Sequence, residues 1–294
     1  METEVNSFLT NLEIEPAYSK STQMAYASDL RAFLRFLHSS QGYLPKPTDL
    51  NTDRVAAFLE SERQIGRSRS TLVRRVAALK NFREFMAGKG IITKEAFAVD
   101  DPKIQSIISA VPKRISQRCL TPDEINSLLT CMESSPRPRS LRDQAILMFL
   151  LETGLPVSEL TELDMSDLDL RSGRFHVNLV GKGDLWLALG EAKYSVELYI
   201  QDGRPNLVHQ PGEPALFISQ MNGRLSRQGI WQILNYWGQL VNPPLSLSPR
   251  ILRNTAVLRM IKAGISGADI QIRLGHSNPL STKALIRRLE NSCL

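Results

Sequence analysis

Cysteine is scarce in this sequence, and its positions exclude the small disulfide-rich class of protein. The 294 residues contain 3 cysteines, Cys119, Cys131 and Cys293. An odd number of widely separated cysteines favours a reducing compartment and predicts neither a disulfide framework nor a zinc site. The chain also lacks a phosphate-cradling glycine loop and a hydrolase triad. We therefore expect no metal and no cofactor.

Long hydrophobic runs are absent too. No apolar stretch approaches the ~20 residues that a membrane-spanning helix needs. The first residues, METEVNSFL, have neither the basic start nor the apolar run of a signal peptide. The sequence therefore predicts a cytoplasmic or nucleoid-associated protein with no membrane partner.

The charge balance is moderately basic. Lysine and arginine number 36 against 30 acidic residues, which gives a formal net charge of +6. An excess of positive charge favours a polyanionic partner, although solvated surface residues produce the same balance. A hydrophobic fraction of 42% and a charged fraction of 22% are typical of a globular protein, and the length suits two domains.

The N-terminal part, residues 1–110, is predicted to be entirely helical. After a short first helix, apolar residues recur at helical spacing in three longer segments that proline and glycine separate. Ser70 is predicted to cap the fourth of these helices. The basic stretch 111–118 then predicts a flexible linker to a second domain, residues 119–294.

Basic residues are concentrated around the fourth helix. Those that we select as candidate contacts are Arg67, Arg69, Arg74, Arg75 and Lys80. A run of charge along a helix usually marks a solvated face. The alternative is a surface that contacts nucleic-acid phosphates, which gives affinity without sequence information. The charge pattern alone supports both interpretations equally.

The C-terminal part combines helices with one β-hairpin. Residues 120–125, LTPDEI, predict a capped helix start, and residues 141–151 predict a buried helix. Residues 174–189 predict a β-hairpin with a glycine turn, and residues 216–219 a short strand. The last stretch, 249–294, predicts three short helices. Together these elements give a mainly α fold with a small β-hairpin or sheet, of the α+β class.

Several short motifs occur in the order of a known family. They are SKSTQMAYASDLRAF at 19–33, SRSTLVRRVAALKNF at 68–82, TGLPVSEL at 153–160, LRNT at 252–255 and LGHS at 274–277. In type and order they resemble the signature stretches of the tyrosine recombinase family, which includes phage integrases and Xer-like proteins. The resemblance implies a helical core-binding domain of the SAM-like type, followed by a domain of the tyrosine-recombinase catalytic type. It also implies double-stranded DNA as the partner, held between the two domains.

Three positions depart from the family pattern where it carries its chemistry. Pro156 stands where TGLRVSEL has an arginine that clamps the scissile phosphate, and Arg250 stands where HxLRHT has its first histidine. The family's nucleophilic tyrosine follows the last histidine by nine residues, and that position here holds Leu285. No tyrosine occurs after Tyr236. The resemblance therefore implies a domain without its nucleophile.

Three other positions retain the residue types of the family's phosphate pocket. Lys182 resembles the hairpin lysine that protonates the leaving 5′ oxygen, Arg253 matches the second clamp arginine, and His276 matches the final histidine. A lone histidine is usually a structural residue, but its place in LGH downstream of Arg253 favours a remnant of the pocket. Arg250 can also bind phosphate, whereas a permanently protonated guanidinium cannot serve as a general base.

These observations support one leading hypothesis and two alternatives. The leading hypothesis is a catalytically inactive DNA-binding protein that clamps duplex DNA in an architectural or regulatory role, with the lysine, the two arginines and the histidine of the pocket holding a phosphate. The first alternative is an active site-specific recombinase with a displaced nucleophile, such as Ser277, Ser281 or Thr282. The second is a protein-interaction subunit that pairs with itself or with an active recombinase.

Overall fold

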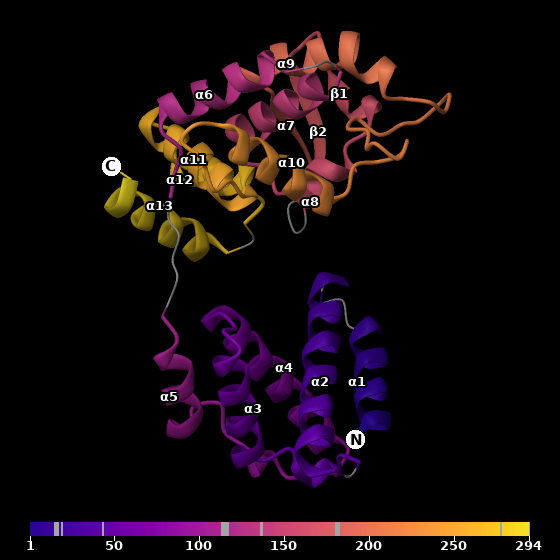
Figure 1. Ribbon diagram of the computed structural model, residues 1–294, viewed down its shortest axis with the longest axis vertical. Helices are drawn as coiled ribbons and strands as arrows, with labels where there is room; N and C mark the ends of the chain where they lie inside the picture. Colours follow the sequence, from indigo (N-terminus) through magenta and orange to yellow (C-terminus); the bar gives the residue numbers. More distant parts are fainter. Residues whose placement is uncertain are drawn as a thin grey trace. The chain divides into compact units, whose positions relative to one another are not determined.

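A computed structural model describes residues 1–14, 18, 20–42, 44–112, 118–135, 138–179, 183–276 and 278–293. The chain forms two compact units, Met1–Ile115 and Ser116–Leu294, which we call the N-terminal unit and the C-terminal unit (Figure 1). Each unit has a large apolar core of its own. No helix within the described ranges is both long enough and apolar enough to span a bilayer.

The N-terminal unit is a bundle of helices. Its α-helices are α1 (Glu2–Ile14), α2 (Lys20–Gln41), α3 (Thr52–Gln64), α4 (Arg69–Gly88) and α5 (Pro102–Ala110), with single 3-10 turns at Pro47–Asp49 and Lys94–Ala96. Helix α2 packs against α1, α3 and α4, and α5 packs against α3 and α4. Large aromatic side chains fill the core between them: Phe8, Phe33, Phe58, Phe82 and Phe97.

The starts of α3 and α4 follow from capping side chains. Asn51 accepts a hydrogen bond from the backbone N–H of Arg54 at 3.1 Å and begins α3. The prediction that Ser70 caps α4 is wrong. Ser68 has the extended backbone of an N-cap and accepts from the N–H of Thr71 at 3.2 Å, so Ser70 already lies inside the helix.

The C-terminal unit is mainly helical and contains one small sheet. Its α-helices are α6 (Pro122–Glu133), α7 (Arg139–Thr153), α8 (Val157–Glu162), α9 (Ala192–Leu198), α10 (Arg227–Leu240), α11 (Pro249–Lys262), α12 (Gly267–Arg273) and α13 (Pro279–Cys293). The sheet consists of the antiparallel strands β1 (Leu168–Asp169), β2 (Arg174–Leu179) and β3 (Gly183–Ala188), in that order. Helix α7 packs against α6, α9 and α11 and forms the centre of the core.

The predicted fold class is confirmed, with one local correction. The hairpin forms as predicted, and its register pairs Leu179 with Gly183 and Arg174 with Ala188. The short strand predicted at residues 216–219 is wrong, because this segment makes only isolated bridges, such as Ile218 to Arg224. The chain reverses immediately afterwards, where the N–H of Ser219 donates to the carbonyl of Gly223, so no longer ladder can form.

The last three helices pack on one another around a small apolar cluster. Helix α12 is capped by Ser266, and α12 is followed by Gly275 at a left-handed φ of 65°. Buried side chains of α11, α12 and α13, together with Leu274 just after α12, make up what we call the α11–α13 cluster: Ala256, Val257, Met260, Ile270, Leu274 and Leu289. This cluster positions the candidate site.

Candidate functional site

Helix α11 carries two of the predicted site residues one turn apart. Ser248 caps the helix by accepting from the N–H of Ile251 at 3.3 Å, and Pro249 occupies the first helical position. Arg250 lies in the first turn and is exposed, whereas Arg253 is half-buried. Both cations therefore lie near the positive end of the helix dipole, where an anion is stabilised.

Arg253 links three segments of the C-terminal unit. Its Nη1 donates to the carbonyl of Gly154 at 2.9 Å, and its Nη2 donates to the carbonyl of Leu274 at 2.6 Å. Nη2 also lies 3.1 Å from Nε2 of His276. A guanidinium has five N–H donors, so these contacts leave Nε and one hydrogen of Nη1 to bind an anion. Burial lowers the pKa of Arg253 to about 10, which keeps the side chain charged at neutral pH.

His276 is held in one tautomer by two neighbours. Arg253 can only donate, so Nε2 of His276 accepts its hydrogen bond. The ring proton of the neutral form then lies on Nδ1, which donates to Oγ1 of the buried Thr282 at 2.9 Å. Burial and, secondly, the charge of Arg253 lower the pKa of His276. The ring is therefore neutral at pH 7, and both of its nitrogens are already engaged.

Pro156 lies two residues after Gly154. Its φ of −58° and ψ of 142° make it the N-cap of α8. Gly154 has a left-handed φ of 63°, and a Cβ there would lie 3.2 Å from Leu274 and 3.3 Å from Ala256, so this close turn requires glycine. Proline offers neither a charge nor a hydrogen-bond donor. The positive charge next to this turn is therefore that of Arg253 on α11, which donates to the carbonyl of Gly154.

Leu285 lies in α13 and is half-buried. Its side chain packs against the α11–α13 cluster together with that of Ile286. The position that the family pattern assigns to tyrosine therefore provides an apolar contact that attaches α13 to α11 and α12.

The structure brings some of the predicted site residues together and leaves others undescribed. Arg253 and His276 are in direct contact, and Arg250 lies one turn before Arg253 on the same helix. Lys182 and Ser277 lie outside the described residues. Thr282, which the sequence suggested only as a displaced nucleophile, is the buried hydrogen-bond partner of His276. The six-residue spacing between them, across the start of α13, gave no local signal of this contact.

Four of the candidate basic residues in the N-terminal unit reach its surface. Arg69 is half-buried, and Lys80 is 48% exposed with a long ion pair of 3.7 Å to Glu84. Arg67 is 53% exposed and pairs with Glu62 at 3.2 Å. The fourth is Arg74, which is 40% exposed and pairs with Asp29 of α2 at 2.5 Å.

Arg75 lies inside the unit. Its Nη1 lies 2.7 Å from a carboxylate oxygen of Glu62, and its Nε lies 3.5 Å from Asp29. The guanidinium also lies over the ring of Phe58, 5.1 Å from the centroid. Arg75 therefore ties α4 to α2 and α3, and we assign it a supporting function rather than a direct contact with a ligand. Its neighbour Arg74 points elsewhere because successive helical residues are ~100° apart around the axis.

Sequence analysis missed three residues of α2. Arg31 and Arg35 are exposed and four residues apart, so they share one face of the helix, and this spacing is the signal that could have identified them. Asp29 is buried between Arg74 and Arg75. Burial raises the pKa of Asp29, and the two arginines oppose that shift.

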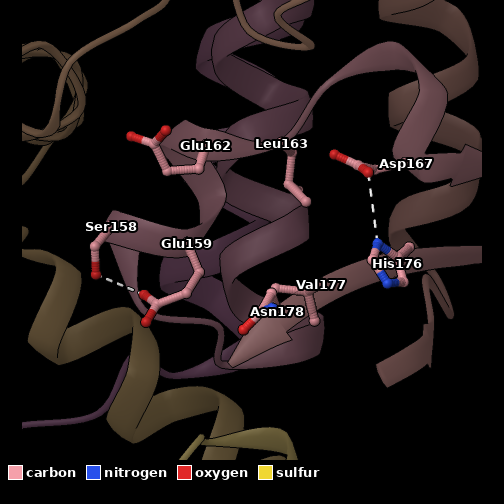
Figure 2. Close-up of a pocket in the computed structure, with 8 residues that line it drawn as sticks. All are labelled: Ser158, Glu159, Glu162, Leu163, Asp167, His176, Val177 and Asn178. Atoms are coloured by element: carbon pink, nitrogen blue, oxygen red, sulfur yellow. Dashed lines mark hydrogen bonds and ion pairs between the residues drawn. The ribbon is translucent and has the colours of Figure 1, made fainter. Parts of the chain in front are cut away.

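A cavity of about 370 Å³ lies between α8 and β2, but carboxylates line it (Figure 2). Glu159, Glu162 and Asp167 face this space, and Nδ1 of His176 lies 3.6 Å from Asp167. Clustered negative charge repels a phosphate, so this cavity is not the candidate anion site. Across the part of the chain that the structure describes, no three His, Cys, Asp or Glu residues are grouped to hold a metal ion.

Comparison with known proteins covers both units. The phage integrase family matches residues 118–290, and the N-terminal SAM-like domain of phage integrases matches residues 5–90. The tyrosine recombinase XerC of Roseiflexus castenholzii is 34% identical over 289 residues, which span 96% of this chain and 88% of that protein. The tyrosine recombinase XerD of Halalkalibacterium halodurans is 29% identical over 96% of this chain and 93% of its own length.

Solved structures share the fold at low sequence identity. The integrase of transposon Tn1549, solved with a circular intermediate DNA, superposes with a TM-score of 0.70 at 16% identity and covers 99% of both chains. A lambda integrase dimer bound to a COC′ core site gives a TM-score of 0.65 at 19% identity, over 97% of this chain and 95% of that one. On the family matches and the XerC likeness, the chain belongs to the phage integrase family, the family of the tyrosine recombinases.

Proposed function

We propose that this chain is a DNA-binding member of the family that does not cleave DNA and acts in an architectural or regulatory way in recombination. The observation that carries the proposal is Leu285. A leucine occupies the position of the family's tyrosine, and its side chain packs against the α11–α13 cluster. A side chain without a hydroxyl cannot form the covalent bond to DNA phosphate that strand transfer requires.

The electrostatics of the site support the same conclusion. Phosphoryl transfer depends on cations positioned around the charge that develops on the phosphate oxygens. Pro156 removes one of the two clamp arginines, and removing one such donor typically costs ~2.7–4 kcal/mol of transition-state stabilisation. The loss of both the nucleophile and a clamp arginine leaves a site suited to binding a phosphate and unsuited to reacting with it.

Thr282 is disfavoured as a displaced nucleophile by its surroundings. Its side chain is buried, with 2% of its surface exposed, so DNA cannot reach the hydroxyl without movement of α13. Nδ1 of His276 carries the ring proton in the neutral form and donates to this hydroxyl. The histidine therefore cannot take the proton of Thr282, and a hydroxyl of ordinary pKa needs such a base.

The proposed DNA contacts come from both units, divided as domains 1–110 and 119–294 with the linker 111–118. In the C-terminal unit, Arg253 has two donors left for a phosphate, and Lys182 and the exposed Arg250 complete the set. His276, the fourth residue of the predicted pocket, supports Arg253 through its Nε2. In the N-terminal unit, the proposed phosphate contacts on or next to α2 and α4 are Arg31, Arg35, Arg67, Arg69, Arg74 and Lys80. The two units close round duplex DNA, and the excess of positive charge supplies affinity without reading sequence.

Duplex binding across a salt series tests the DNA-binding part. The logarithm of the affinity should fall linearly with the logarithm of salt concentration, by about 0.9 per phosphate contact. The double variant Arg69→Ala with Lys80→Ala should make this slope shallower by about 2. Lys103→Ala is the matched control, because Lys103 is also exposed but lies on α5 and pairs with Asp53 at 2.6 Å. An unchanged slope in the double variant would contradict the proposed surface.

Covalent capture tests the absence of cleavage. A pool of nicked duplexes with randomised sequence traps any recombinase that forms a phosphodiester to its own side chain, and a family member with the tyrosine serves as the positive control. We expect binding and no covalent product. Covalent product would overturn the proposal and identify another nucleophile. Failure to bind DNA at any salt concentration would instead favour a protein-interaction subunit, paired with itself or with an active recombinase.

A further inference from the structure

Two cysteines that are far apart in the sequence meet in the C-terminal unit. Cys119 lies three residues before the start of α6, and Cys293 is the last residue of α13. Their side chains are hydrogen-bonded to each other. Both also pack against the α11–α13 cluster. The third cysteine, Cys131 of α6, packs instead against the main core of the unit.

The backbone on both sides of Cys119 is fixed on α11. The N–H of Leu120 donates to Oγ1 of the buried Thr255 at 2.8 Å, and Nδ2 of Asn254 donates to the carbonyl of Arg118 at 3.5 Å. Residue 119 lies between these two anchored neighbours. The backbone on either side of Cys119 is therefore held by side chains of α11.

The other partner is anchored through α13. Helix α13 packs against both α11 and α12. Leu289, one turn before Cys293, is fully buried in the cluster. The same cluster therefore holds both cysteine side chains.

We propose that Cys119 and Cys293 form an oxidation site at which a hydroperoxide converts the two thiols to a disulfide. Disulfide formation requires Cα atoms within about 7 Å and Cβ atoms that face each other, and directly hydrogen-bonded thiols favour such an arrangement. The site is specific to this pair, because Cys131 packs in a different apolar core.

The chemistry balances with hydrogen peroxide as the oxidant. The sulfur of Cys293 attacks one peroxide oxygen, the O–O bond breaks, and water leaves with the thiol proton, which gives a sulfenic acid. The sulfur of Cys119 then attacks the sulfenic sulfur, the S–S bond forms, and a second water leaves with the proton of Cys119. In sum, two thiols and one peroxide give one disulfide and two waters.

Burial explains the order of these steps. Burial, and secondly the neighbouring thiol of Cys293, raise the pKa of Cys119 to about 12. The thiolate is the reactive form, so Cys119 is a poor first target for peroxide. It instead attacks second, once the sulfur of Cys293 has become electrophilic.

The disulfide would attach the end of α13 to the start of the C-terminal unit. The bond closes a loop that contains nearly the whole unit, and loops of this length confine the unfolded chain strongly. The oxidised chain should therefore unfold at a temperature about 5–10 °C higher than the reduced chain. Amide exchange in α13 should slow in parallel, because the helix can no longer detach from its free end.

Alkylation after oxidation provides the test on the full chain. The protein is treated with hydrogen peroxide, unfolded, alkylated with N-ethylmaleimide and weighed by mass spectrometry. We expect one alkylated thiol instead of the 3 of the untreated chain, and a return to three after reduction with dithiothreitol. Digestion with trypsin and a glutamate-specific protease cuts after Glu124, so the linked peptides should be 119–124 and 291–294.

Single serine variants identify the pair. Cys131→Ser should form the same disulfide and leave no alkylated thiol. Cys119→Ser should form no disulfide within the chain, because the sulfenic acid of Cys293 then has no thiol partner. Three alkylated thiols after peroxide treatment, a bond that includes Cys131, or a bond between two chains would each overturn the proposal. The wild-type peptide map decides the question even if a variant fails to fold.

Discussion

Arg75 gives a sharp test of how the N-terminal unit is held together. Arg75→Ala removes the cation that lies between Asp29 of α2 and Glu62 of α3. The side chains of these acids are only 2% and 11% exposed, and burial already raises the pKa of Asp29. Without Arg75, Asp29 retains Arg74 at 2.5 Å and Glu62 retains Arg67 at 3.2 Å.

The expected loss of stability follows from these contacts. Removing one partner of a buried ion pair typically costs ~3–5 kcal/mol. Because each acid keeps one arginine, we expect the lower end of that range, ~3 kcal/mol, and the lost stacking on Phe58 adds ~0.5–1 kcal/mol. The free energy of unfolding of the unit should therefore fall by about 3–4 kcal/mol. If this free energy decreases by ~1.5–2 kcal/mol for each molar of urea, the midpoint of unfolding should fall by about 2 M urea.

The distribution of tryptophan makes the assay specific to one unit. All 3 tryptophans, Trp186, Trp231 and Trp237, belong to the C-terminal unit, so their fluorescence follows that unit, whereas far-ultraviolet circular dichroism follows both. Arg75→Ala should move part of the circular dichroism transition to lower urea and leave the fluorescence midpoint unchanged. Lys80→Ala, at an exposed position of the same helix, should move neither transition.

The opposite result would refute the structural interpretation of Arg75. If Arg75→Ala leaves both transitions in place and weakens DNA binding as much as Arg69→Ala does, Arg75 contacts phosphate directly. The buried ion network would then contribute little to the unit, and the supporting function assigned to Arg75 would be incorrect.

Three further predictions concern the C-terminal unit. Leu285→Tyr should give far less covalent product with nicked DNA than the positive control, because in the proposed function Pro156 leaves the phosphate without one of its two clamp arginines; covalent capture at the level of the positive control would contradict this. The lowered pKa of His276 means that the folded chain favours the neutral ring, so its contribution to stability is complete above about pH 6.5 and is lost as the pH falls through the lower folded value. The melting temperature of the wild type should therefore fall more steeply below about pH 6.5 than that of His276→Gln. Parallel plots of melting temperature against pH would exclude this contribution. Thr255→Val removes the acceptor of the Leu120 N–H, and chemical unfolding followed by tryptophan fluorescence should show a loss of about 1–3 kcal/mol, whereas an unchanged midpoint would mean that another group accepts this bond.

Local features of this chain followed from its sequence. The cap of α6 is an example, because Thr121, Pro122 and Glu124 form a capping box with proline at the first helical position, and this arrangement involves residues only three apart. The hairpin and the glycine ends of the last helices are similarly local. The order of the motifs was enough to identify the family resemblance, and the absence of tyrosine at position 285 is visible by counting.

Tertiary structure decided the hydrogen-bond partners and the exposure of the candidate residues. Arg253 reaches the carbonyl of Gly154, 99 residues away, and the tautomer of His276 depends on that arginine together with Thr282. Arg74 and Arg75 are adjacent and chemically identical in the sequence, yet one reaches the surface and the other lies under it.

The physical reason is the range of the forces involved. Capping, turn conformation and helical periodicity act within a few residues, so the sequence alone determined where most helices and the hairpin form. Burial, and with it the charge state and partners of a side chain, depends on which distant segments pack together. The sequence therefore determined the family fold and the leucine at position 285, whereas only the tertiary structure decided which of the candidate arginines are exposed and that Cys119 meets Cys293.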